Sequence, residues 1–468
     1  MRFSSKDGGL LVADFTTQSV LFPELFDRPL LARFDRPAAS SDGGAILLKA
    51  ADRRLGLMDA LAGCLRDTRD PAKVRHGLDE LLAQRVYGLA CGYEDANDAA
   101  RLVDDPIQKL LLGRDAITGD GLASQPTLSR FENGVTRAEL LQLSEALYET
   151  VLKRQRKRLR GKVRTITIDL DVTDDPTHGQ QELAFFHGHY GHWCYLPLLA
   201  YLTFNGEPEQ HLVAALLRPG KAPTSLGALM MLKRILGDLQ ERFPRARLLV
   251  RLDGGFAGPE LLEFLDEVCV GYVVGLPANA VLERAAEAML APMRLRSELS
   301  GATEHGYGEC RYAAKTWDRE RRVVIKAEVV WHEGREPRDN PRFVVTNLKR
   351  VPQRLYEGVY CLRGEIENRI KELHHGLAFD RTSCTRFLAN QLRVLLTAAA
   401  YVLMQEIRAA ARRTSLARAQ VSTLRERLFK LGVEVVVSVR RIVLHLPTTF
   451  AFRDEWNQVA AALGAGSG

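Results

Sequence analysis

The hydrophobic period of the chain changes at Val163, and this change constrains the fold more than any other feature. Between residues 45 and 148, apolar side chains recur at spacings of three and four, which is typical of helices. From Val163, in VRTITIDLDVTDD, apolar and polar side chains alternate. Strict alternation is the pattern of a strand with one apolar face. A helical N-terminal region followed by a sheet is therefore expected.

The segments after this strand predict a mixed sheet. Strands are expected at 193–204, 211–217, 247–252 and 271–276, and helices at 225–243 and 259–268. Consecutive strands followed by alternating helices and strands indicate an α/β sheet with helices on its faces. Residues 303–350 are again rich in strands, and helical periodicity returns from about Tyr356 to Thr414. The β-rich block therefore resembles an insertion within one domain.

These patterns predict five regions. They are a helical region at 1–155, the first part of the α/β domain at 156–300, a β-rich insertion at 301–352, the second part of the domain at 353–405, and a basic helical region at 406–468. The last assignment depends on charge, because nine Arg or Lys stand against two Glu between Ile407 and Arg441. The net charge of the whole chain is +7, which fits a polyanionic partner without identifying one.

Composition excludes several classes of protein. With 46% hydrophobic and 26% charged residues among 468, the chain is neither collagen-like nor wholly disordered. Its seven cysteines include no Cys-x-x-Cys pair, which argues against a disulfide framework or a zinc ribbon and favours a reducing compartment. The N-terminus lacks a signal-peptide pattern, and the most apolar run, Leu392 to Met404, is too short to span a bilayer. A soluble intracellular protein is expected.

Two segments of the helical region are candidates for binding DNA. In LASQPTLSRFENG, Ser124 can cap a helix that exposes Arg130, as a recognition helix would, although an ordinary capped surface helix has the same pattern. The second segment is a basic run that contains Lys153, Arg154, Arg156, Lys157 and Arg158. Such a run either contacts phosphates or forms a solvated helix end.

Three acidic residues are candidates for chemistry. Asp171 lies on the polar face of the first strand, Asp253 follows the strand at 247–252, and Glu367 lies in the helical segment YCLRGEIENRIKELHHGL. Carboxylates from neighbouring strands and a packed helix can hold two Mg²⁺ ions for phosphoryl transfer. Each residue also has a structural alternative, since Asp commonly caps turns and Glu367 is spaced for helical salt bridges.

Together these residues give the chain a resemblance to the DDE transposases of bacterial insertion sequences. The family's signature helix carries Tyr-x2-Arg-x3-Glu-x6-Lys, and Tyr360, Arg363 and Glu367 match its spacing. The final Lys is replaced by His374, and Lys371, one turn earlier, is the candidate to replace it. The family's Asp-x-Thr motif selects Asp171-Val172-Thr173 and the strand-end motif selects Asp253. Asp169 remains a rival for the first Asp.

The resemblance implies a ribonuclease-H-like mixed sheet with helices on both faces. The resemblance also implies a Mg²⁺ cofactor, with Mn²⁺ as a substitute, held by Asp171, Asp253 and Glu367. The implied partners are double-stranded DNA, as terminal inverted repeats and target, and a second copy in the synaptic complex. Tyr360, Arg363, Lys371 and His374 would contact DNA, and the protein would act in the bacterial cytoplasm at the nucleoid. A catalytically inactive DNA-binding derivative and a ribonuclease-H-like nuclease without strand transfer remain alternatives.

A histidine group adjoins the first strand. His178, His187, His189 and His192 fall within fifteen residues. Four histidines could bind Zn²⁺, but no acidic or Cys ligand follows at a zinc-site spacing. The aromatic neighbours instead favour a hairpin whose Tyr190 or His192 contacts DNA.

Overall fold

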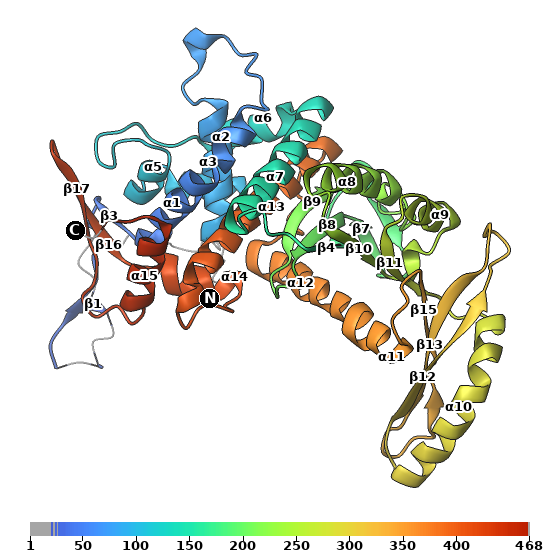
Figure 1. The fold of residues 1–468 in the computed structure, drawn as a ribbon. Helices are drawn as coiled ribbons and strands as arrows, with labels where there is room; N and C mark the ends of the chain where they lie inside the picture. Colours follow the sequence, from blue (N-terminus) through green and yellow to red (C-terminus); the bar gives the residue numbers. More distant parts are fainter. Residues whose placement is uncertain (1–19, 22–23, 26, 467–468) are drawn as a thin grey trace, which may run out of the picture.

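The computed structural model describes residues 20–21, 24–25 and 27–466. Its centre is a large mixed sheet (Figure 1). The strands, in their order across the sheet, are β12 (Glu304–Tyr312), β13 (Arg321–Val330), β15 (Arg342–Thr346), β11 (Gly271–Leu276), β10 (Arg247–Leu252), β4 (Thr165–Val172), β8 (Leu198–Phe204) and β9 (His211–Leu216). The two-residue β14 (Arg338–Asp339) pairs with β13. The predicted mixed sheet is therefore present.

Strand direction divides the sheet at β4. Strand β10 runs parallel to both β4 and β11, whereas β8 is antiparallel to β4 and to β9. The alternation in β4 explains its central place, because Ile166, Ile168 and Leu170 are fully buried on one face. The opposite face carries Asp169 and Asp171 toward the carboxyl end of the strand.

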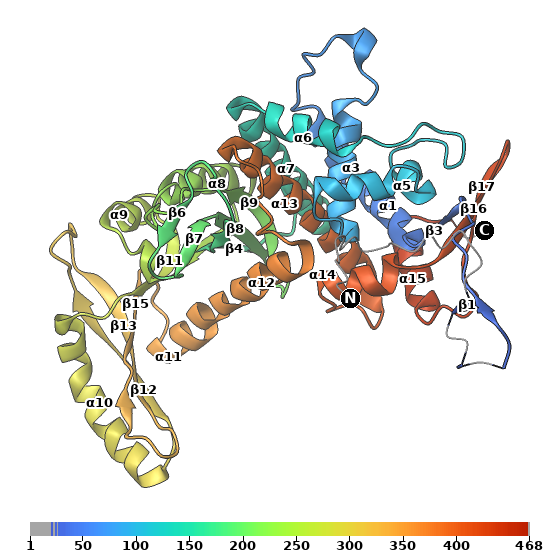
Figure 2. The ribbon, with the colours of Figure 1, turned by 180° about the vertical axis from the view of Figure 1, so that it is seen from behind.

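Helices cover both faces of this sheet. Figures 1 and 2 show α8 (Ala228–Arg242) and α9 (Pro259–Glu267) on one side and α12 (Glu365–Leu377) on the other. The chain enters α12 through α11 (Pro352–Leu355), a π-helical turn (Tyr356–Tyr360) and a 3₁₀ turn (Cys361–Gly364). Such irregular turns reposition the side chains that follow them.

The β-rich segment forms an arm that projects from the body (Figures 1 and 2). Helix α10 (Ala280–Ser300) packs along β12 and β13 in this arm. Because β15 pairs with β11, the arm continues the central sheet and has no separate sheet of its own.

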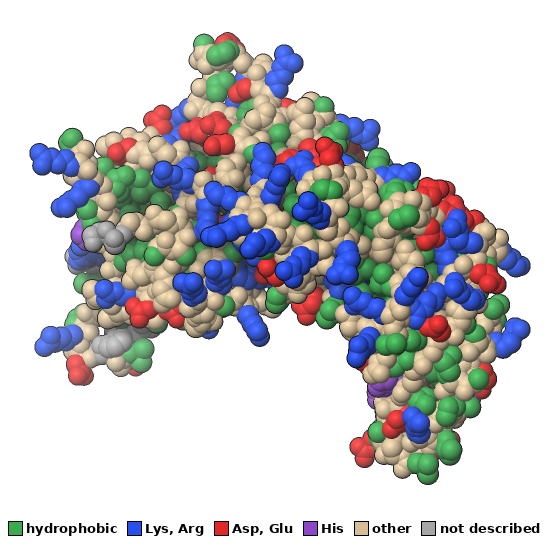
Figure 3. Space-filling view, in the orientation of Figure 1, with side chains coloured by type: hydrophobic (Ala, Val, Ile, Leu, Met, Phe, Trp, Pro, Cys, Tyr) green, Lys and Arg blue, Asp and Glu red, His purple; other side chains and the backbone are tan. Residues whose placement is uncertain are grey.

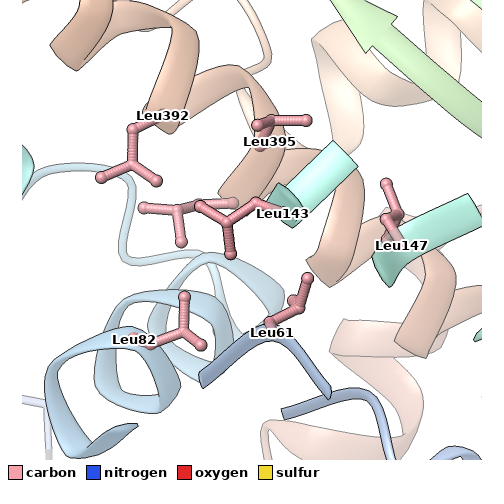
Figure 4. A pocket seen from close by; sticks show the side chains of 7 residues that line it. Leu61, Leu82, Leu143, Leu147, Leu392 and Leu395 are labelled. Carbon is pink, nitrogen blue, oxygen red and sulfur yellow. The ribbon is translucent and has the colours of Figure 1, made fainter. Parts of the chain in front are cut away.

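The N-terminal helices pack around a central helix, α13 (Phe387–Ala410). They are α1 (Ile46–Leu55), α2 (Leu57–Ala62), α3 (Leu78–Cys91), α4 (Ala99–Leu102), α5 (Pro106–Leu111), α6 (Gln125–Gly134) and α7 (Arg137–Arg158). Helix α13 is long and apolar enough to cross a membrane, but 89% of that stretch is buried inside the protein. Leucines from α2, α3, α7 and α13 meet in Figure 4 around a void of only about 10 Å³. This region is packed core and leaves no space for a ligand.

The expectation that residues 406–468 are helical is wrong in part. The helical elements there are α14 (Val421–Leu424), a π turn (Arg425–Phe429) and α15 (Arg453–Leu463). Between them, β16 (Val433–Ser438) and β17 (Arg441–His445) form a hairpin, and β3 (Ala39–Ser40) pairs with β16. The physical reason is the β-branched run VEVVVSVRRIV, whose alternate side chains suit a half-buried strand.

Candidate active site

The sheet brings Asp171 and Asp253 to neighbouring positions. In the parallel pairing of β4 and β10, Asp169 lies opposite Arg251, so Asp171 and Asp253 follow two residues later at the carboxyl ends of both strands. Their charges interact, because Asp253 contributes to a raised pKa at Asp171. In open α/β sheets, ligands bind beyond the carboxyl ends of the strands. The two carboxylates therefore lie where a ligand site is expected.

A close backbone approach packs Tyr360 against the segment of Asp253. The Asp253 carboxylate accepts a hydrogen bond from the Gly255 amide at 2.9 Å, which shapes the turn after β10. At Gly275 of β11, a Cβ atom would lie only 2.6 Å from the Tyr360 hydroxyl and 2.8 Å from the Gly254 nitrogen. Only glycine therefore allows Tyr360 to lie over this end of the sheet.

Arg363 places a positive charge among the three acidic candidates. Its Nη1 donates to Asp171 Oδ2 at 2.8 Å, and its Nη2 lies 3.8 Å from Glu367 Oε1. Burial nevertheless raises the pKa of Asp171 to about 6, because desolvation outweighs the attraction of Arg363. The Glu367 side chain is 58% exposed. The structure thus gathers Asp171, Asp253, Arg363 and Glu367 at one end of the sheet.

Asp169, the rival candidate, makes a different set of contacts. It is completely buried, and its two oxygens accept hydrogen bonds from Arg251 at 2.7 Å each. Gln210 donates a further hydrogen bond at 3.0 Å. Arg251 also donates to the Val359 carbonyl of the π turn at 3.1 Å. The Asp169–Arg251 pair therefore joins β4, β10 and the segment that carries Tyr360.

The helix end beyond Glu367 is attached to β4 through His374. His374 Nε2 lies 3.0 Å from Thr173 Oγ1, and its Nδ1 lies 3.8 Å from Asp380 Oδ2. The contact with His374 lowers the pKa of the Asp380 carboxyl. Lys371 instead is exposed to solvent. The two candidates for the final position of the signature helix thus lie in different environments.

The histidine-rich hairpin lies beside the same strand end. It consists of β6 (Phe185–His187) and β7 (His192–Tyr195), and β7 also pairs with β5 (Asp175–Pro176). His192 Nε2 lies 2.9 Å from Asp174 Oδ2. Burial raises the pKa of Tyr190, and the charges of Asp174 and Asp171 raise it further. Tyr190 and His192 are therefore neighbours of the acidic cluster.

The candidate DNA-binding residues of the N-terminal region are only partly free. Arg154 and Arg158 of α7 form ion pairs with Glu406 at 2.8 Å and with Glu207 at 2.6 Å. Lys153, Arg156 and Lys157 are exposed, as is Arg130 on α6. Ser124 occupies the N-cap position of α6 but makes no side-chain capping bond. Within the described residues, no ion pair or hydrogen bond joins this run to the acidic cluster.

Sequence reasoning missed Arg251, Asp174 and Asp380. Asp174 precedes a proline-containing pair and has the pattern of a turn, and Arg251 has the pattern of an ordinary polar position in a strand. Their roles depend on tertiary contacts with residues distant in the sequence or on turn geometry, which one sequence does not give.

The donor set suits a hard divalent cation, although no metal cluster is formed. Over 27–466 and the short described segments before them, no three His, Cys, Asp or Glu side chains converge closely enough to hold an ion. The acidic candidates supply only carboxylate oxygens, which are the ligands that Mg²⁺ prefers. Desolvation is the main cause of the raised pKa of Asp171 and the charge of Asp253 adds to it, and a bound cation would counter both. The residues present therefore fit the ion chemically, with Arg363 as the present counter-charge.

Comparison with known proteins gives a family. The model of the family "transposase DDE domain group 1" matches residues 22–466. No curated protein matches the sequence. A solved piggyBac transposase synaptic complex with hairpin DNA shares 9% identity over 82% of this chain and 79% of that chain, with a TM-score of 0.40. An endonuclease V of Ciona intestinalis in complex with DNA shares 12% identity over 48% and 89%, with a TM-score of 0.23. On the strength of the family match, which spans nearly the whole sequence, the chain belongs to the transposase DDE domain group 1 family.

Proposed function

We propose that this chain is a Mg²⁺-dependent DNA transposase that cleaves the terminal inverted repeats of an insertion sequence and transfers the freed ends to target DNA. The observation that carries the proposal is the adjacency of Asp171 and Asp253 at the ends of parallel strands, under a helix that presents Glu367. The family match supplies independent support.

The sheet supports the ribonuclease-H-like part of the proposal. The order β9, β8, β4, β10, β11, with β8 antiparallel to its neighbours and the last three strands parallel, is the arrangement expected of that fold. In this arrangement the first and fourth strands present their acidic residues side by side. The arm formed by α10 and β12 to β15 follows the fifth strand, β11.

Each residue of the cluster has a role in the proposal. Asp171, Asp253 and Glu367 would hold the metal, with Asp169 kept in its ion pair. Two divalent ions supply activation of the attacking oxygen and stabilisation of the leaving one. Arg363, once Asp171 is neutralised by another cation, can bind a DNA phosphate through its planar guanidinium. His374 holds the helix to the strand end through Thr173.

The remaining parts of the proposal concern partners and location. The substrate is double-stranded DNA, and joining two ends of one element requires at least two copies of the protein in the synaptic complex. Action in the bacterial cytoplasm, at the nucleoid, follows from a substrate that is chromosomal. Mn²⁺ can replace Mg²⁺, because both prefer oxygen ligands.

A strand-transfer assay tests the proposal. Purified protein is incubated with Mg²⁺, a labelled duplex that carries the DNA flanking the gene, and a supercoiled target plasmid. Cleavage at the repeat ends followed by joined products is the expected result. Cleavage without joining would leave a nuclease, and binding without cleavage would leave an inactive DNA-binding derivative. The variant Glu367→Gln is the matched control for catalysis.

A further inference from the structure

The hairpin near the C-terminus, formed by β16 and β17 and here named the ribbon, projects from the body. Ser438 pairs with Arg441, so the two strands are joined by a turn of Val439 and Arg440 alone. Figures 1 and 2 both place the ribbon at the opposite end of the molecule from the arm, with the central sheet between them. The ribbon is therefore remote from the acidic cluster.

Only the root of the ribbon packs against the protein. Val433 and Val435 are buried, and β3 pairs with β16 there. Toward the tip, the exposed fractions are 47% for Val436, 51% for Ile442 and 106% for Val439. Exposed apolar side chains at the end of a projecting hairpin are available for contact with a partner.

Charge on the ribbon points to an anionic partner. No Asp or Glu occurs between Val435 and Arg453. In the described part of the chain, no carboxylate forms an ion pair with Arg440 or Arg441 at the tip. The acidic residue at the root, Glu434, lies 3.8 Å from Arg36, which partly offsets its charge. Figure 3 shows Lys or Arg side chains at the projecting end.

We propose that the ribbon is a second contact site for double-stranded DNA, which anchors the duplex away from the point of cleavage. A two-stranded ribbon fits the major groove, which is about 12 Å wide. Arg440 and Arg441 would contact phosphates on the groove walls, and Val439 would pack against the base edges. This inference rests on the proposed function, because it supplies the grip on the repeat that cleavage at a fixed position requires.

A competing occupant is a second copy of the chain. Strand β17 is the edge of a sheet in the order β17, β16, β3, and its outer backbone groups could pair with another strand. Two adjacent arginines at the tip oppose such pairing between identical ribbons, since like charges would meet. The balance of charge therefore favours DNA.

The test compares two double variants that each remove two exposed arginines. Arg440→Ala/Arg441→Ala changes the ribbon, and Arg284→Ala/Arg296→Ala changes exposed positions of α10 in the arm. Binding to a labelled duplex with the DNA that flanks the gene is titrated by fluorescence anisotropy at several KCl concentrations. The ribbon variant should bind roughly tenfold more weakly, and the slope of log K against log salt should fall by about 2, at about 0.9 per lost phosphate contact. The arm variant should keep the slope of the wild type.

The outcomes separate the two proposals. If the wild type binds and the ribbon variant binds equally well, the inference is wrong and the proposed function stands. If the wild type binds no duplex, the proposed function fails and the ribbon loses its role with it. An unchanged slope together with a shift from dimer to monomer on a sizing column would assign the ribbon to self-association. Circular dichroism checks folding, and Val439→Lys, which adds a charge at the tip, should raise the slope by about 1.

Discussion

Two aspartates on the same face of β4 should respond in opposite ways to loss of charge. Asp169→Asn removes the negative charge that balances Arg251, which is 6% exposed, and replaces one of the two oxygens that accept from its guanidinium with an NH2 donor. Breaking a buried ion pair from one side costs about 3–5 kcal/mol, because a buried charge is left unpaired. At roughly 2 °C per kcal/mol for a large domain, the melting temperature should fall by at least about 6 °C.

Asp171→Asn should leave the fold intact and abolish cleavage. Desolvation and the charge of Asp253 already raise the pKa of Asp171 to about 6, so its ionised form is disfavoured in the metal-free protein. At pH 7 and without metal, removing this charge should raise the free energy of unfolding by up to about 3 kcal/mol, because the raised pKa already includes the Arg363 contact and the ionised carboxyl is disfavoured in the folded protein. The rate of cleavage should fall by several orders of magnitude, which is the usual contribution of metal-assisted charge stabilisation.

The assay combines thermal melts with Mg²⁺ cleavage of one duplex for both variants. Cleavage by Asp169→Asn is measured below its melting transition, where measurable activity is expected. If Asp169→Asn has the same melting temperature as the wild type, the ion pair does not stabilise the fold and the argument from burial is refuted. If Asp171→Asn still cleaves, the role of first ligand passes to Asp169.

Three further predictions follow from the same site. Glu367→Gln should reduce the rate of cleavage by several orders of magnitude. Its affinity for the duplex, measured by gel-shift titration, should stay within about twofold of the wild type. If cleavage and affinity are lost in parallel, Glu367 has a structural role. With EDTA, the free energy of unfolding should fall by about 3 kcal/mol in total as the pH rises from well below 3.8 to well above 6, because folded Asp171 binds its proton more tightly than the unfolded chain does. Urea melts of Asp171→Asn should lack this loss. His374→Ala should lower the rate of cleavage about 10-fold to 100-fold, because Thr173 loses its hydrogen-bond partner. His374→Gln, whose amide can still donate to the Thr173 hydroxyl, should recover part of the lost activity. Equal loss of activity in both variants would contradict the positioning role of His374.

Much of the sheet was predictable because its strands are short apolar runs between polar turns. The strand expected at 247–252 coincides with β10 and that at 271–276 with β11, and the strand-rich block at 303–350 contains β12 to β15. Burial on both sides leaves such runs nearly continuous in apolar residues, so their ends are marked by the first polar or glycine residue. The family's motifs predicted that Asp171 and Asp253 lie close together, and the parallel pairing of their two strands is the physical reason.

The ribbon was missed because charge was weighed above periodicity. Nine basic residues between Ile407 and Arg441 favoured a helical region, whereas the alternating valines at 433–439 carried the strand signal. The ion pairs made by the basic run at 153–158 could not be predicted, for a different reason. Arg154 finds its partner, Glu406, 252 residues later, and no local pattern reveals a pairing at that distance.

The signature helix could be located from the sequence but its path could not. Even spacing predicts that Tyr360, Arg363 and Glu367 share one face of a regular helix. The chain instead reaches α12 through a π turn and a 3₁₀ turn, and the π turn presents the Val359 carbonyl to Arg251. This hydrogen bond depends on tertiary contact, which local spacing does not encode.

The two arginines of the site, Arg251 and Arg363, differ in how firmly their charges are held. Arg251 is held by both oxygens of the buried Asp169 and by a backbone carbonyl, so its charge is fully engaged in joining the sheet to the helix. Arg363 makes one hydrogen bond to Asp171 and a longer approach to the exposed Glu367. A charge held by fewer contacts is the easier one to transfer to a new partner, and Arg363 stands beside the carboxylates that a metal would neutralise. Under the proposed function, neutralising Asp171 with a cation would free the Arg363 guanidinium to bind a DNA phosphate.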